Sequence, residues 1–126
     1  MDIIELAREI GREIQKDEDY IKMRLSVQAI EADEELKKLE NEYDIKCAKL
    51  QGEAVKPDRD ADKLEQLCEE MIPLHRRIIK NINFANYVAA KKKFDVKLQR
   101  VLAIINNSAE GDDPETTDYA PESKDN

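Results

Sequence analysis

Hydrophobic residues recur every three or four positions along most of this chain, which is the spacing of one face of an α-helix. The longest such stretch covers residues 83–107, and its large side chains fall on one broad face: Phe84, Tyr87, Val88, Phe94, Leu98, Val101, Leu102 and Ile105. A narrower stripe of smaller residues lies roughly opposite: Ala85, Ala89, Val96 and Ala103. A helix with two apolar sides needs packing partners on both sides. The pattern therefore predicts a long C-terminal helix that contacts other helices of the chain or a second copy of it.

Two shorter helices are predicted before residue 32. Residues 2–15 carry apolar positions at helical spacing, and Asp2 is suited to cap their start. The acids at 17–19 favour the start of a second helix, because carboxylates are stabilised at the positive end of the helix dipole; that helix is predicted to run to about Glu31. Gly11 within the first helix indicates either close helix packing or chance.

A polar turn at residues 56–60 separates two striped helices. The first begins at Asp33 and ends near Gly52, and the second carries apolar residues at close to heptad spacing. Such a pair predicts an antiparallel hairpin, with a kink but no end at Pro73. The predicted register pairs Leu50 with Leu64, Tyr43 with Met71 and Leu36 with Ile78.

The composition supports an all-α fold. Charged residues make up 40% of the 126 residues and there are only three glycines, which is atypical of a sheet protein. We therefore predict an antiparallel helical bundle, built on the long hairpin and the long C-terminal helix, with short N-terminal helices. The bundle should occupy residues 1–108, because residues 109–126 have two prolines and no apolar period and are typical of a disordered acidic tail.

The net charge of −8 is concentrated in that tail, which holds seven acids and one lysine. The body is left with a charge of about −2, which argues against extensive nucleic-acid binding. The N-terminus has acids where a signal peptide needs positive charge, and no apolar run is long enough to span a membrane. We expect a cytoplasmic protein that does not bind membranes.

Candidate catalytic and metal-binding groups are sparse. Cys47 and Cys68 form no CxxC pair, and the hairpin register places them at nearly the same level on the two facing helices. A buried, reduced pair is the favoured interpretation, and a disulfide or a shared metal is the alternative. The single histidine, His75, is expected at the surface. Because no catalytic motif is present, we predict no enzymatic activity and no cofactor.

Six basic residues lie on either side of the short connection before the last helix: Arg76, Arg77, Lys80, Lys91, Lys92 and Lys93. Complementation of the helix dipole and a solvated face explain such a cluster without a ligand. The alternative is a site for an anionic partner such as a nucleic acid or a phosphate.

Several short motifs together resemble the YlbF/YmcA family of bacterial regulators. They are MDIIELAREIG at the start, DEEL at 33–36, KPDRD at 56–60, the set Asn81, Tyr87, Ala90 and Lys91, and GDDPET at 111–116. The resemblance covers nearly the whole chain. It implies a small cytoplasmic helical regulator, commonly self-associating and found mainly in Firmicutes.

The roles of known relatives indicate the function that we expect for this chain. The best-known relatives form a complex that promotes competence, sporulation and biofilm formation and works with the endoribonuclease RNase Y in messenger processing. Some relatives carry C-terminal cysteines and are associated with iron–sulfur clusters, whereas Thr117 follows the PET motif here and the tail has no cysteine. This departure from the family pattern argues against a cluster. The resemblance implies a regulatory adaptor that binds other cytoplasmic proteins, among them related family members and an RNA-processing enzyme.

Self-association is the most specific of these expectations. The core is thin for the length of the chain, and the small-residue stripe Ala85, Ala89, Val96 and Ala103 leaves room for a close helix contact. That stripe faces either the first helix of the same chain or the same helix of a second subunit. We expect a homodimer through the stripe. A local basic patch that binds nucleic acid or phosphate is the alternative function.

Overall fold

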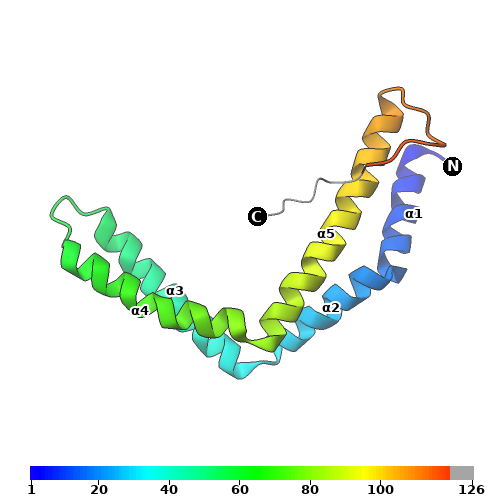
Figure 1. Cartoon of the computed structure of the whole chain (residues 1–126). Coiled ribbons are helices and arrows are strands. Elements are labelled where there is room, and N and C mark those ends of the chain that lie inside the picture. The colour runs from blue at the N-terminus through cyan, green and yellow to red at the C-terminus, as the bar shows by residue number, and fades with distance from the viewer. Residues whose placement is uncertain (120–126) are drawn as a thin grey trace. The chain divides into compact units, whose positions relative to one another are not determined.

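The computed structural model describes residues 1–119, in which five α-helices and no strands occur (Figure 1). The helices are α1 (Ile3–Lys16), α2 (Glu18–Glu31), α3 (Glu34–Ala54), α4 (Ala61–Lys80) and α5 (Ile82–Ala109). The predicted all-α class is confirmed. Residues 120–126 of the predicted tail lie outside the described residues, and the prediction that the tail is disordered stays a prediction.

Acidic side chains set the helix starts. Asp2 precedes α1 and accepts a hydrogen bond from the backbone N–H of Glu5 at 2.8 Å. Asp33 precedes α3 and accepts one from the N–H of Leu36 at 3.0 Å, and Asp60 caps α4 in the same way. Each cap satisfies N–H groups that lack a partner within the helix. The predicted starts are therefore confirmed to within one residue.

Asparagines organise the junction between α4 and α5. Asn81 caps the end of α4, and its side-chain oxygen accepts a hydrogen bond from the N–H of Phe84 at 3.0 Å in the first turn of α5. The Nδ2 groups of Asn81 and Asn83 donate to the same Asp33 carboxylate oxygen at 3.0 and 2.9 Å. The start of α3 is thereby tied to this junction. Pro73 lies inside α4, which continues through it as predicted.

The chain divides into two compact units. The hairpin unit is Arg24–Val88 and holds α3, α4, most of α2 and the first part of α5. The terminal unit is Met1–Met23 together with the chain from Ala89 onward, so it holds α1, the start of α2 and the rest of α5.

The hairpin unit contains the main hydrophobic core, formed where α3 and α4 lie side by side (Figure 1). Its buried members are Leu36, Leu39, Leu74 and Ile78, and Ile30, Tyr43 and Phe84 pack against them. Ion pairs cross the hairpin between Lys46 and Glu70 at 2.8 Å and between Arg77 and Glu35 at 3.3 Å. The antiparallel hairpin is therefore confirmed, and Leu36 and Ile78 share a core as the register predicted.

Few apolar side chains are covered in the terminal unit. Phe94 of α5 is buried, and its ring lies 5.2 Å from that of Tyr20, while α1 contains no buried residue. A Cβ added at Gly11 would meet nothing within 4 Å, so no close helix packing among residues 1–119 explains that glycine. The broad face expected to be buried on α5 is covered only in part, because three members remain about half exposed: Val88, Leu102 and Ile105.

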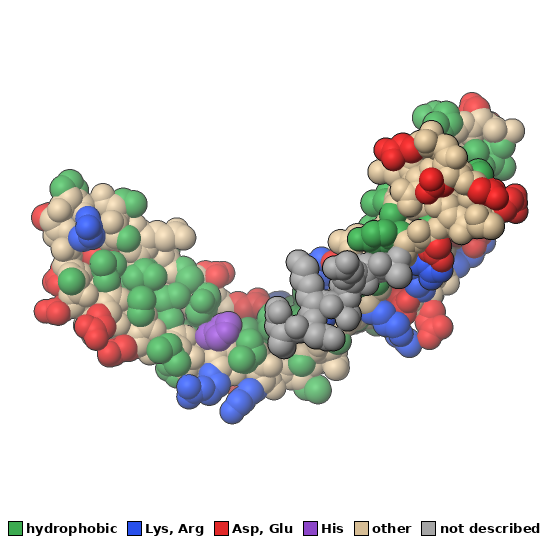
Figure 2. Space-filling model, turned by 45° about the horizontal axis from the view of Figure 1, so that its top comes forward, with side chains coloured by type: hydrophobic (Ala, Val, Ile, Leu, Met, Phe, Trp, Pro, Cys, Tyr) green, Lys and Arg blue, Asp and Glu red, His purple; other side chains and the backbone are tan. Residues whose placement is uncertain are grey.

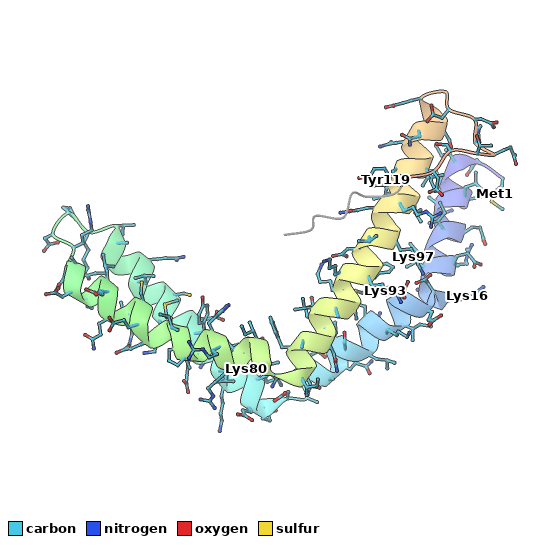
Figure 3. The ribbon with its side chains drawn as sticks, viewed as in Figure 1. Met1, Lys16, Lys80, Lys93, Lys97 and Tyr119 are labelled. Carbon is cyan, nitrogen blue, oxygen red and sulfur yellow. The ribbon has the colours of Figure 1, made fainter. Side chains whose placement is uncertain are left out.

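A side-chain ion pair joins the chain after α5 to that helix. Arg100 donates two hydrogen bonds to the carboxylate of Asp118, at 2.8 and 2.6 Å, and this arrangement lowers the pKa of Asp118 to about 2. The neighbouring Tyr119 consequently lies beside α5 (Figure 3). Both partners of the pair are about half exposed, so the contact is a surface one.

Candidate interaction surfaces

An open apolar groove of about 370 Å³ runs between α1 and α5 in the terminal unit. Leu6, Ile10 and Ile14 line it from α1, and Phe94, Leu98 and Val101 line it from α5. Charged side chains stand at its edges: Glu9, Glu13, Asp17 and Lys97. Helical spacing places the three α1 residues on one face, yet Leu6 is 50% exposed, so this face lacks the cover that a core would supply.

Lys97 closes one end of this groove, hereafter the α1–α5 groove. Its Nζ lies 2.8 Å from the carboxylate of Asp17 and 2.6 Å from that of Asp19, and Lys93 lies 3.4 Å from Asp19 (Figure 3). The hydrogen bonds from Lys97 lower the pKa of both carboxyls and raise the pKa of Lys97 itself. Because Asp17 also accepts hydrogen bonds from the first N–H groups of α2, the corner between α1 and α2 is anchored to α5.

A second groove, of about 420 Å³, lies on one face of the hairpin unit. It is lined by Tyr43 and Leu50 of α3 and by Cys68, Met71, Ile72, His75, Arg76 and Ile79 of α4. Figure 2 shows hydrophobic side chains gathered on this part of the hairpin, beside the single histidine. Tyr43, Leu50 and Met71 line the same groove, in agreement with the predicted register.

The two cysteines differ from the buried pair that was expected. Both are free, but Cys47 is half-buried and Cys68 is exposed. Cys68 follows the buried Leu67 by one residue, so it points along the hairpin groove instead of into the contact with α3. Within residues 1–119 no group of three or more His, Cys, Asp and Glu side chains is placed to hold a metal ion.

His75 is exposed, as predicted, and its ring lies 6.1 Å from that of Tyr43. It belongs to a set of α4 residues, spaced by four, three and four, that the sequence interpretation missed: Cys68, Ile72, His75 and Ile79. Ile72 and Ile79, seven residues apart and next to the main stripe, were the signal that could have indicated this second apolar face.

The small-residue stripe predicted as the oligomer interface lies along α5. Ala85, Ala89 and Val96 are exposed, and Ala103 is half-buried. The homodimer interface along this stripe stays a prediction.

The six basic residues divide between the two units and are partly neutralised. Arg76, Arg77 and Lys80 lie in the last turns of α4, in the hairpin unit, and Lys91, Lys92 and Lys93 lie on α5 in the terminal unit. Three of them have carboxylate partners: Arg77 with Glu35, Lys91 with Asp95, and Lys93 with Asp19. An anionic ligand would compete with these internal pairs.

Comparison with known proteins assigns the chain to a family. None of the helices in residues 1–119 has the length and apolar character needed to cross a bilayer. No match was found among curated proteins or among solved structures. One family model matches residues 3–109, which span α1 to α5, and its description is control of competence regulator ComK, YlbF/YmcA. The chain therefore belongs to the YlbF/YmcA family of regulators.

Proposed function

We propose that this protein is a non-enzymatic regulatory adaptor that self-associates and binds other cytoplasmic proteins through its helix faces. The exposed apolar surface of the terminal unit is the observation that carries the proposal. Ile3, Ile4 and Leu6 of α1 and Leu102 of α5 are each at least half exposed. Covering one such side chain contributes about 1.5 to 3 kcal/mol, so a partner that covers several gains considerable binding energy.

The α1–α5 groove is the surface we propose for a protein partner. Its walls are apolar and its edges carry both acids and a lysine, an arrangement typical of grooves that accept an amphipathic helix. Partners in keeping with the family include related family members and an RNA-processing enzyme such as RNase Y. Processes in keeping with it are competence, sporulation and biofilm formation.

The positions of five aspartates are in keeping with a non-enzymatic protein. Asp2, Asp33 and Asp60 cap helices, and Asp17 and Asp19 pair with Lys97. These carboxylates therefore have structural roles, whereas a general acid or base needs a free position beside a substrate.

A crosslinking pull-down from the native cell tests the proposal. We expect the full chain to retain a protein partner at physiological salt, and Leu6→Glu to lose it, because the charge enters the α1–α5 groove. Ile45→Glu is the matched control, since Ile45 is 48% exposed on α3 and does not line that groove. RNA recovered in place of protein, with binding that falls steeply as salt rises, would favour the basic patch.

A further inference from the structure

The outer face of α4 carries an apolar stripe that lies open along the hairpin groove. Its members are Cys68, Ile72, His75 and Ile79, and all four are exposed. Ile72 is 54% exposed and Ile79 is 49% exposed, although the neighbouring Leu74 and Ile78 are buried against α3. Two large apolar side chains one heptad apart have the spacing at which packed helices contact each other in coiled coils.

Four charged residues follow one edge of this stripe, acids first and bases after them: Glu65, Glu69, Arg76 and Lys80. All four are exposed, and none forms an ion pair with another residue of the described chain, 1–119. By contrast, the adjacent Glu70 pairs with Lys46, and Arg77 pairs with Glu35. The edge of the stripe therefore presents complementary charges that the chain itself leaves unused.

We propose that a second copy of the chain packs against this face, with its α4 antiparallel to the first and a two-fold axis close to Ile72. This inference rests on the self-association in the proposed function and names the surface that performs it. In an isologous contact, residues at equal distances on either side of the axis face each other.

The order of the charges fixes the direction. At a rise of about 1.5 Å per residue, Glu69 and Arg76 lie about 5 Å on either side of the axis, and Glu65 and Lys80 lie about 11 Å from it. In the antiparallel arrangement each acid of one copy therefore faces a base of the other. Parallel copies would place the acids of both chains at one end of the contact and the bases of both at the other, so no acid would face a base.

The apolar stripe supplies the centre of this contact. Ile72 packs against the same region of the second copy, and Ile79 flanks it toward each end. The hairpin groove, about 420 Å³ between α3 and α4, is large enough to receive branched side chains of the second α4. The residues that line the α1–α5 groove belong to the terminal unit, and none of them is part of the α4 stripe.

Charge reversal tests the register by light scattering on the full chain. Glu69→Arg alone, or Arg76→Glu alone, turns two attractive contacts of the dimer into repulsive ones, so each should raise the dissociation constant about tenfold. The double variant, Glu69→Arg with Arg76→Glu, should restore it. Lys92→Glu is the control for a change of charge alone, because Lys92 is exposed on α5.

An engineered intermolecular disulfide tests the position of the two-fold axis directly. Helix axes in contact lie about 8 to 10 Å apart, close enough for cysteines near a two-fold axis to bond. Ile72→Cys in a Cys68→Ser background should form an intermolecular disulfide on mild oxidation. Leu25→Cys in the same background should not, because Leu25 is equally exposed but lies on α2.

The outcomes separate this inference from the proposed function. A wild-type chain that stays monomeric at high micromolar concentration would remove self-association altogether. A dimer that is indifferent to both charge reversals and forms no Ile72→Cys disulfide would overturn the α4 contact alone. If Val96→Glu gave folded monomers while the α4 variants stayed dimeric, the stripe on α5 would be the interface instead.

Discussion

Lys97 is the residue that joins the most distant parts of the terminal unit. Its ammonium bridges Asp17 and Asp19, and its hydrogen bond to Asp17 joins residues 80 positions apart in the chain. Asp19 is only 7% exposed, and its charge is compensated mainly by Lys97, with Lys93 3.4 Å away as a second partner. Asp17 caps the end of α1, and Asp19 lies in the first turn of α2. Because Lys97 binds both carboxylates, it fixes this helix junction relative to α5.

Replacing Lys97 with methionine should raise the pKa of Asp17 and Asp19 toward their ordinary values. The physical reason is that the hydrogen bond from Lys97 is the largest cause of the lowering at each carboxyl. An NMR titration of the side-chain carboxyl carbons measures the change. Lys92→Met is the matched control and should leave both values unchanged, because Lys92 has no part in this cluster.

The same cluster predicts how stability responds to acid. Because the folded-state pKa of Asp17 and Asp19 is lowered, their contribution is complete above the ordinary pKa and is lost as pH falls through the lowered value. The raised pKa of Lys97 gives a contribution that is complete below its ordinary value and is lost only as pH rises through the raised one. Urea unfolding between pH 2 and 7 should therefore show a smaller acid loss for Lys97→Met than for wild type; equal losses would contradict the role of the cluster.

Leu36 is the residue on which the hairpin core depends most, because it is 0% exposed between α3 and α4. Leu36→Ala should lower the free energy of unfolding by about 2 to 5 kcal/mol. Leu25→Ala removes the same atoms from a side chain that is 58% exposed, and it should cost less than about 0.5 kcal/mol. Similar losses for the two variants in denaturant titration would show that the core is elsewhere.

At the scale of elements, α4 has two distinct apolar faces and a proline between its ends. Leu67, Leu74 and Ile78 are buried toward α3, while Ile72 and Ile79 face the open groove. The helix persists across Pro73 because its packing against α3 outweighs the missing N–H bond to the carbonyl of the residue four positions earlier.

Restoring that bond should stabilise the hairpin. Pro73→Ala returns a backbone donor to the exposed side of α4, and we expect the free energy of unfolding to rise by up to about 3 kcal/mol. Gly52→Ala in α3 is the variant for comparison, because its added methyl group meets nothing within 4 Å. Its free energy of unfolding should rise by about 1 kcal/mol, the difference in helix propensity between glycine and alanine. A loss of stability in Pro73→Ala would mean that the proline ring itself makes a needed contact.

At the scale of the whole molecule, the described part of the acidic C-terminal segment is joined to α5 by a surface ion pair. The Arg100 and Asp118 side chains are 55% and 51% exposed, and an ion pair at such a site is weakened by water and salt. With seven acids and one lysine the segment carries most of the net charge of −8, and this charge favours solubility more than folding.

Deletion of residues 109–126 should therefore leave the melting temperature nearly unchanged. The net charge would move from −8 to about −2, because the segment holds seven acids and one lysine. Circular dichroism on heating, for the full chain and the truncated chain at the same salt, measures the effect. A large drop for the truncated chain, reproduced by Asp118→Asn, would show that this contact supports the fold.

The sequence alone was sufficient for the helices, their starts and the hairpin. Each capping aspartate accepts a hydrogen bond from a backbone N–H at most three residues further along the chain, as Asp2, Asp33 and Asp60 do. The 3.6-residue hydrophobic period is equally local, so both features can be recognised in the sequence without a structure. Leu36 and Ile78 share a core as expected because a short turn leaves an antiparallel hairpin little freedom of register.

Which apolar side chains are covered was decided only by the tertiary structure. Phe94 is buried but Leu102 and Ile105, on the same predicted face of α5, are about half exposed, and Cys68 faces a groove instead of the core. Periodicity places residues on a face of a helix, whereas burial depends on whether another helix lies against that face. The link from Lys97 to Asp17 and Asp19 likewise joins residues far apart in the chain, and no local pattern in the sequence specifies it.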